Sequence, residues 1–227
     1  MTPATPTPPR RAPDASPPPD LTPLSNAAHF HERTRVKGVN MLVYRVVRFF
    51  LLPFFLIYFR LDRVGREHMP QEGPVIVAAN HRSFLDPFIL GTMSKRPLYY
   101  VSKKELFERR WQGWILNSLG AFPVARGRAD EEMLETARAI LARGDSLVIF
   151  PEGTRTRSGS LARPKRGVGR LALETGAQVI PIAITGTEHV RRGWRIRSRK
   201  VRMRAGQPLV FPLTSDPSPD LADAVTA

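Results

Sequence analysis

From residue 61 onward, short apolar runs alternate with amphipathic runs, and glycine, proline or charged residues separate them. Several of the short runs are apolar on successive positions, which is typical of central strands in a parallel sheet. The predicted strands span 61–65, 74–80, 98–102, 122–126, 146–151, 178–185 and 200–206, and the predicted helices span 86–94, 105–118, 130–143 and 165–176. This alternation predicts an α/β domain with a mostly parallel central sheet flanked by helices.

The most apolar segment, residues 41–59, precedes this domain and is flanked by basic residues. Its uninterrupted run, 49–59, would extend only about 16 Å as a helix, well short of a hydrocarbon core about 30 Å thick. A longer span would place Arg45 and Arg48 in hydrocarbon at a cost of about 2.5–3.5 kcal/mol each. We therefore predict one or two helices over 36–60 that lie in a membrane interface, with arginines at the headgroups. A buried core helix and a tilted single span are the alternatives.

Proline, threonine, serine and alanine dominate the first 25 residues, which cannot bury a core. We predict a disordered proline-rich tail over 1–28, a membrane-associating helical segment over 29–60 and the α/β domain over 61–227. The tail has no apolar region behind its arginines and does not resemble a secretory signal. A helical pattern begins again at 221–227, so a terminal helix that continues beyond this sequence is expected.

The net charge is +15, from 35 Lys and Arg against 20 Asp and Glu. Such an excess attracts an anionic partner, either a nucleic acid or a phospholipid surface, and charge alone does not choose between them. Cysteine is absent from all 227 residues, which excludes disulfides, thiolate metal sites and a cysteine nucleophile. No cluster with metal-ligand spacing occurs either, so we predict no metal and no bound cofactor.

The segment AANHRSFLDP (78–87) carries the most informative chemistry, because a predicted buried strand ends in His81 and Asp86 follows five positions later. With His81 on the strand-to-helix turn and Asp86 before Pro87 as a helix N-cap, the carboxylate can reach back to the imidazole. Ser83 is the alternative cap. A carboxylate on one ring nitrogen leaves the other able to take a proton, as a general base does. A solvated histidine beside an ordinary cap is the alternative interpretation.

A second segment, SLVIFPEGTRTRSG (146–159), ends an apolar strand in a turn that contains Glu152, Gly153, Thr154 and Arg155. Ligands of open α/β sheets bind at the carboxyl ends of strands, and a guanidinium can grip a phosphate through two parallel bonds. A tight turn with a surface arginine is equally consistent with the sequence.

Three further segments add weaker signals. GAFPVARG (120–127) places Arg126 at the end of a short strand, and VIPIAITGTE (179–188) is an apolar strand in which Pro181 requires a bulge or an edge. The arginine-rich stretch 189–204, which includes Trp194, is either an extension of a basic membrane-facing surface or an exposed hairpin or edge strand.

Taken together in chain order, the four segments 78–87, 120–127, 146–159 and 179–188 resemble the motifs of the PlsC-like glycerolipid acyltransferases, the lysophosphatidic acid acyltransferase type, over roughly residues 60–211. That resemblance implies His81 as the base and Asp86 as its orienting partner. It assigns binding of the glycerol phosphate to Arg126 and to Glu152, Gly153, Thr154 and Arg155. Lys165 is implied as a further basic residue of the substrate site, and Pro181 as part of the acyl-side motif. Ala125 departs from the family pattern, in which a polar residue often stands beside the motif arginine.

The resemblance implies transfer of a fatty acyl group from acyl-CoA or acyl carrier protein to the free hydroxyl of lysophosphatidic acid. Glycerol 3-phosphate or another lysolipid as acceptor is the first alternative, and a basic membrane- or nucleic-acid-binding module is the non-enzymatic one. The implied partners are a phospholipid membrane, a lysophospholipid acceptor and an acyl thioester donor, with no nucleic acid. The implied location is the cytoplasmic face of the cell membrane, bound peripherally or within one leaflet.

Overall fold

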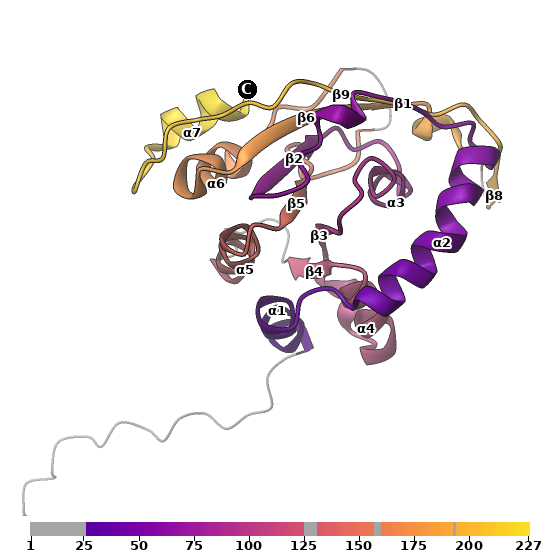
Figure 1. Ribbon diagram of the computed structural model, residues 1–227, viewed down its shortest axis with the longest axis horizontal. Coiled ribbons are helices and arrows are strands. Elements are labelled where there is room, and N and C mark those ends of the chain that lie inside the picture. Colours follow the sequence, from indigo (N-terminus) through magenta and orange to yellow (C-terminus); the bar gives the residue numbers. More distant parts are fainter. Residues whose placement is uncertain (1–25, 125–130, 157–159, 193) are drawn as a thin grey trace, which may run out of the picture.

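The computed structural model describes residues 26–124, 131–156, 160–192 and 194–227. Its main sheet has seven strands in the order β1-β9-β6-β2-β5-β3-β4 (Figure 1). The strands are β1 (Asp62–Val64), β2 (Val75–Ala79), β3 (Leu98–Lys103), β4 (Ala121–Val124), β5 (Ser146–Ile149), β6 (Gln178–Thr185) and β9 (Arg202–Ala205). Strands β6, β2, β5, β3 and β4 run parallel, whereas β9 is antiparallel to β6 and parallel to β1. The predicted mostly parallel sheet is confirmed.

Helices cover both faces of this sheet (Figure 1). They are α1 (Asn26–Val36), α2 (Met41–Tyr58), α3 (Asp86–Leu90), α4 (Arg110–Ser118), α5 (Glu131–Ala142), α6 (Gly167–Thr175) and α7 (Pro219–Thr226). Short 3-10 turns are η1 (Arg66–His68), η2 (Lys104–Phe107) and η3 (Thr187–His189), and a separate hairpin pairs β7 (Arg191–Arg192) with β8 (Arg195–Ile196).

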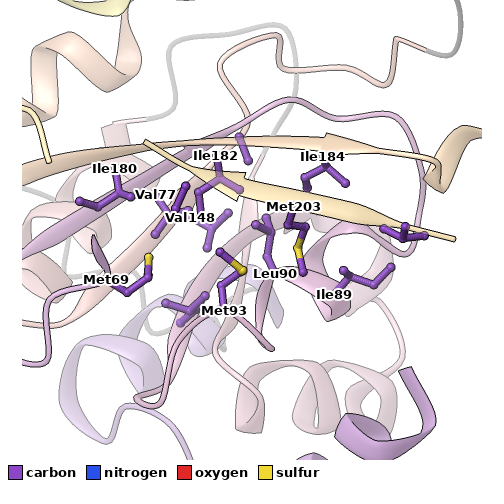
Figure 2. Packing of buried hydrophobic residues seen from close by; sticks show 14 of the residues in the cluster. Met69, Val77, Ile89, Leu90, Met93, Val148, Ile180, Ile182, Ile184 and Met203 are labelled. Atoms are coloured by element: carbon purple, nitrogen blue, oxygen red, sulfur yellow. The ribbon is translucent and has the colours of Figure 1, made fainter. Parts of the chain in front are cut away.

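The central strands divide their side chains between two apolar layers, as the two-residue period of a strand requires. In β2, Val75 and Val77 belong to the layer under α2 and α3, whereas Ile76 belongs to the layer under α5 and α6. Figure 2 shows the first layer, in which Val77 and Val148 from the parallel strands approach Leu90 of α3. Burial on both faces explains why the strands are apolar on successive positions.

Two helical predictions differ from the structure. The predicted helix 105–118 is divided into η2 and α4, because Arg109 adopts an extended conformation between them. Helix α1 begins at Asn26, three residues before the predicted helical segment, and packs on α4 and α5. Its buried Phe30 fills the space above Gly113, where an added Cβ would lie 2.5 Å from the Phe30 ring. Residues 1–25 of the predicted tail lie outside the described residues.

Helix α2 is a single helix that continues through Pro53. The Asn40 side chain caps it by accepting hydrogen bonds from the amides of Leu42 and Val43, both at 3.2 Å. Within the described part of the chain, it is the one helix whose length and composition would suit a membrane span. Only 11% of the helix is buried, so its outer face is largely exposed. The predicted apolar helix is therefore present, with one face on the domain and the other uncovered.

Candidate active site

The segment after β2 is held in place by Asn80, whose side chain continues the sheet by one position. Its amide nitrogen donates to the Ile184 carbonyl at 2.9 Å, and its carbonyl oxygen accepts from the Ile184 amide at 2.7 Å. Sequence reasoning gave Asn80 no role, although a side chain with one donor and one acceptor directly after a strand is able to pair in this way. These two hydrogen bonds fix the point at which the chain leaves β2, and they thereby position the next residue, His81.

His81 and Asp86 meet as predicted. The Nδ1 atom of His81 lies 2.9 Å from Oδ2 of Asp86, and the same oxygen accepts from the amides of Arg82 and Ser83, both at 2.7 Å. Asp86 has no exposed surface, and His81 is 7% exposed. A buried carboxylate on Nδ1 favours the tautomer with the proton there, which leaves Nε2 as the nitrogen that can accept a proton.

Asp86 is not the N-cap that we predicted. The cap position of α3 is Leu85, which makes no side-chain capping bond, and Asp86 is the first residue of the helix with Pro87 after it. The reason is that the carboxylate turns back to the preceding amides, those of Arg82 and Ser83, rather than forward into the helix. The alternative cap, Ser83, accepts from Leu85 only at 3.4 Å.

Glu152 holds the second motif against the first. One carboxylate oxygen accepts from the His81 amide at 3.1 Å, and the other accepts from the Thr156 hydroxyl. The Thr156 amide in turn donates to the His81 carbonyl at 2.8 Å. Glu152 is only 7% exposed, so its carboxylate is directed into the protein rather than toward the open side of the turn.

A cavity of about 500 Å³ lies at the carboxyl ends of the parallel strands, and His81 forms part of its wall. The Phe150 ring, which also lines it, stacks on the imidazole with centroids 4.1 Å apart and planes 18° apart. The inner face of α2 closes one side, through Tyr44, Val47, Arg48, Leu51, Leu52 and Phe55. Because most of the lining is apolar, the cavity suits a hydrocarbon chain beside a single imidazole.

Three residues of the predicted phosphate site also line this cavity, namely Gly153, Arg155 and Lys165. Gly153 has a φ of +66°, and a Cβ there would lie 3.0 Å from the Lys165 side chain, so glycine lets that side chain cross the turn. Arg155 and Lys165 are exposed. Arg155 and Lys165 therefore line the same cavity as His81, as do Arg48 and Lys103.

The remaining predicted residues lie elsewhere. Thr154 is exposed and is not part of the cavity lining. Pro181 is exposed on β6, outside the cavity, and its carbonyl accepts from the Gly206 amide at 2.8 Å where the pairing with β9 becomes irregular. This placement agrees with the bulge that a strand proline requires. Arg126 and Ala125 lie outside the described residues.

Arg48 faces the protein, contrary to its predicted place at the headgroups. Its guanidinium donates to the Gly91 carbonyl and, at 2.8 Å, to the Ser94 carbonyl, just after α3 ends. Carbonyls at a helix end need such donors. Beside it, burial raises the pKa of the Tyr100 hydroxyl well above its usual value.

Comparisons with known proteins are consistent with this geometry. A family model described as Acyltransferase matches residues 60–185. A chloroplast 1-acyl-sn-glycerol-3-phosphate acyltransferase of Arabidopsis thaliana is 32% identical over 133 residues, which cover 57% of this chain but only 37% of that protein. The human 1-acyl-sn-glycerol-3-phosphate acyltransferase alpha is 30% identical over 202 residues, 84% of this chain and 70% of that protein.

The fold is also similar to a solved one. The crystal structure of PlsC from Thermotoga maritima, a 1-acyl-sn-glycerophosphate acyltransferase, superposes with a TM-score of 0.63. The two are 25% identical, and the superposition covers 86% of this chain and 77% of the other.

Proposed function

The chain belongs to the Acyltransferase family, and on that premise we propose that it transfers a fatty acyl group from a thioester to the free hydroxyl of lysophosphatidic acid, giving phosphatidic acid. The observation that carries this proposal is the His81–Asp86 pair, 2.9 Å apart, in the wall of a largely apolar cavity. The acyltransferase activity for which the human and Thermotoga maritima relatives are named supports the choice of acceptor.

In the proposed reaction, Nε2 of His81 takes the proton of the acceptor hydroxyl as its oxygen forms a bond to the thioester carbonyl carbon. The carbon–sulfur bond then breaks, and the imidazolium gives the proton to the departing thiolate. Asp86 keeps the imidazole in the required tautomer and stabilises the imidazolium. General-base assistance of this kind contributes about 10²–10⁴ in rate. No acyl-enzyme and no bound cofactor are needed.

Arg155 and Lys165 are the proposed cations for the phosphate of the acceptor, because both border the cavity that contains His81. By family resemblance we add Arg126 and the backbone of the turn at Gly153 and Thr154. The carboxylate of Glu152 would repel a phosphate, so we assign it a positioning role through the His81 amide. A thioester of coenzyme A or of acyl carrier protein is the donor, with its acyl chain in the apolar cavity.

A membrane is the proposed source of the acceptor. The inner face of α2 lines the cavity while its outer face is exposed and apolar, so the helix would lie between lipid and active site. Burial of each exposed Phe or Leu contributes about 1.5–3 kcal/mol, and each arginine near an anionic surface adds about 1 kcal/mol. We place the protein on the cytoplasmic face of the membrane, bound within one leaflet.

The test is acyl transfer by the purified full chain with lysophosphatidic acid in mixed micelles, using acyl-CoA and acyl carrier protein donors in parallel. We expect phosphatidic acid at similar rates from the wild type and from His29→Ala, which alters an exposed histidine of α1, and about 10³-fold more slowly from His81→Ala. Full activity in the His81 variant would exclude the proposed base. Glycerol 3-phosphate and other lysolipids, tested with one labelled donor, identify the preferred acceptor.

A further inference from the structure

All three tryptophans of the chain are exposed: Trp111 by 64%, Trp114 by 46% and Trp194 by 83%. Tryptophan is a residue that folded proteins usually bury for the most part. Single exposed apolar side chains are common and need no explanation, but these three fall into two patches, one at each end of α2. Their grouping at the two ends of α2 therefore indicates a surface that binds a partner.

The first patch lies on α4. Trp111, Trp114 and Ile115 have the three- and four-residue spacing that places side chains on one face of a helix, and all three are exposed. The end of α4 is joined to the start of α2, because the Asn40 amide donates to the Ser118 carbonyl at 3.1 Å. Figure 1 shows α4 beside this part of α2. The patch therefore adjoins the N-terminal end of the exposed apolar helix.

The second patch is the β7–β8 hairpin, represented by the exposed Trp194 and Ile196. The Arg195 guanidinium lies 5.1 Å from the centroid of the Trp194 ring. Two bonds hold the hairpin to the last residue of α2: the Tyr58 hydroxyl donates to the Ile196 carbonyl at 3.0 Å, and the Ser198 hydroxyl donates to the Tyr58 carbonyl at 2.5 Å. In Figure 1, β8 lies beside the C-terminal end of α2.

Between the two patches, α2 exposes large apolar side chains along its length. The most exposed are Leu42, Phe49, Phe50 and Ile57, each by 67–78%. A helix of 18 residues extends about 27 Å, so apolar groups accompany the tryptophans over that distance. The described residues thus present exposed apolar groups at both ends of α2 and along its length.

We propose that α4 and the β7–β8 hairpin enter the headgroup region of an anionic phospholipid bilayer together with α2, so that the protein has a membrane contact at each end of that helix. Tryptophan prefers this region because its ring is apolar and its N–H is polar. Arginines stand beside each patch, at Arg109, Arg110 and Arg195, and they match an anionic surface. A second copy of the chain is a poorer partner, because two surfaces of a molecule with a net charge of +15 repel each other.

This inference rests on the membrane association in the proposed function and sharpens it by choosing the orientation of α2. If both tryptophan patches lie in one headgroup layer, α2 must lie along the membrane surface. A membrane-spanning α2 would instead separate its two ends by the bilayer and withdraw its inner face from the cavity. The structure joins both ends to the folded domain by hydrogen bonds, which favours the surface orientation.

The experiment uses the full chain in three single-tryptophan variants, each with the other two tryptophans replaced by phenylalanine. The probe is a vesicle of phosphatidylcholine and phosphatidylglycerol at three to one, with or without brominated acyl chains. We expect Trp111, Trp114 and Trp194 emission each to shift to shorter wavelength on binding and to be quenched by shallow bromines more than by deep ones. If vesicles bind the protein while Trp194 or both α4 tryptophans keep their aqueous emission, the proposal is wrong.

Matched substitutions provide a second measurement. Trp194→Ser and Trp114→Ser should each reduce vesicle partitioning several-fold, whereas Leu213→Ser, at a residue exposed by 71% on another part of the chain, should leave it unchanged. Blue-shifted emission and a dimer mass by light scattering without vesicles would show that a second copy covers the patches, and would also overturn the proposal. Activity in mixed micelles is measured separately, so loss of the proposed catalysis and loss of the membrane contact are distinguishable.

Discussion

The proposed active-site cavity has two sides, that of the base and that proposed to bind the acceptor phosphate, and the protein holds their polar groups differently. On the base side, His81, Asp86 and Glu152 are at most 7% exposed and are joined to one another through the backbone and side-chain bonds of His81. On the acceptor side, Arg155 and Lys165 are exposed on the turn after β5 and before α6. The base side is thus organised by buried hydrogen bonds, whereas the two proposed phosphate-binding cations are exposed side chains.

This difference has a chemical reason. A general base must keep its tautomer and direction before substrate arrives, and a buried carboxylate with three donors does this at no further cost on binding. A phosphate-binding cation has to exchange water for substrate, and exposed long side chains do so readily. Substitutions on the base side should therefore change kcat, and substitutions on the acceptor side should mainly change KM.

The largest effect is expected for His81→Ala. Loss of the base should lower kcat by about 10³ with KM nearly unchanged, since general-base assistance contributes about 10²–10⁴. Initial rates over a range of lysophosphatidic acid concentrations provide the measurement, and circular dichroism checks the fold. A variant with raised KM and normal kcat would mean that His81 binds the substrate and does not accept the proton. The expected division between kcat effects on the base side and KM effects on the acceptor side would then be wrong.

The next largest effect is expected for Glu152, which belongs to the base side because it accepts from the His81 amide, although it lies in the second motif. Glu152→Ala should lower kcat about 10–100-fold and destabilise the fold by about 1–3 kcal/mol, because the His81 amide loses its acceptor inside the protein. Glu152→Gln retains an acceptor oxygen and should recover much of both losses. If instead both variants raise KM alone, Glu152 belongs to the acceptor side.

A smaller effect is expected on the acceptor side. Arg155→Ala should raise KM for lysophosphatidic acid about tenfold, because one charged hydrogen-bonding group is worth about 1.5–3 kcal/mol at most and Arg155 is exposed. Arg155→Lys should recover part of this loss, since it retains the charge but not the two-pronged geometry. An acceptor that lacks phosphate should be insensitive to both substitutions.

The sequence predicted the base side better than the residues around it. His81 and Asp86 could be paired because their spacing around a strand end allows only a few arrangements. The strands β2, β4 and β5 could be located because they are buried on successive positions and are therefore continuously apolar. The role of Glu152 was not predictable, since the sequence of a turn does not show whether its carboxylate points toward the substrate or toward the protein backbone. Helix α1 was also incompletely predicted, because only Phe30, His31 and Thr34 are buried and they form no long apolar stripe.

The smallest effect should come from the helix behind the acceptor side. Glu174 of α6 accepts from Arg138 of α5 at 2.9 Å and from Arg170 at 2.8 Å. Burial tends to raise the pKa of the Glu174 carboxyl, but the bonds and charges of the two arginines outweigh it, and the pKa is lowered. Because the folded state prefers the ionised form, this carboxyl stabilises the protein above its unfolded pKa of about 4.3 and loses that contribution as the pH falls through its folded pKa.

Glu174→Gln should therefore destabilise the protein by about 1 kcal/mol at pH 7, which corresponds to roughly 2–4 °C in Tm. Thermal unfolding of both proteins between pH 3 and 7 provides the measurement. The difference in Tm should be constant near neutrality and shrink below about pH 4, where the wild-type carboxyl also becomes protonated. A difference that stays constant down to pH 3 would show that the destabilisation does not come from the charge of Glu174.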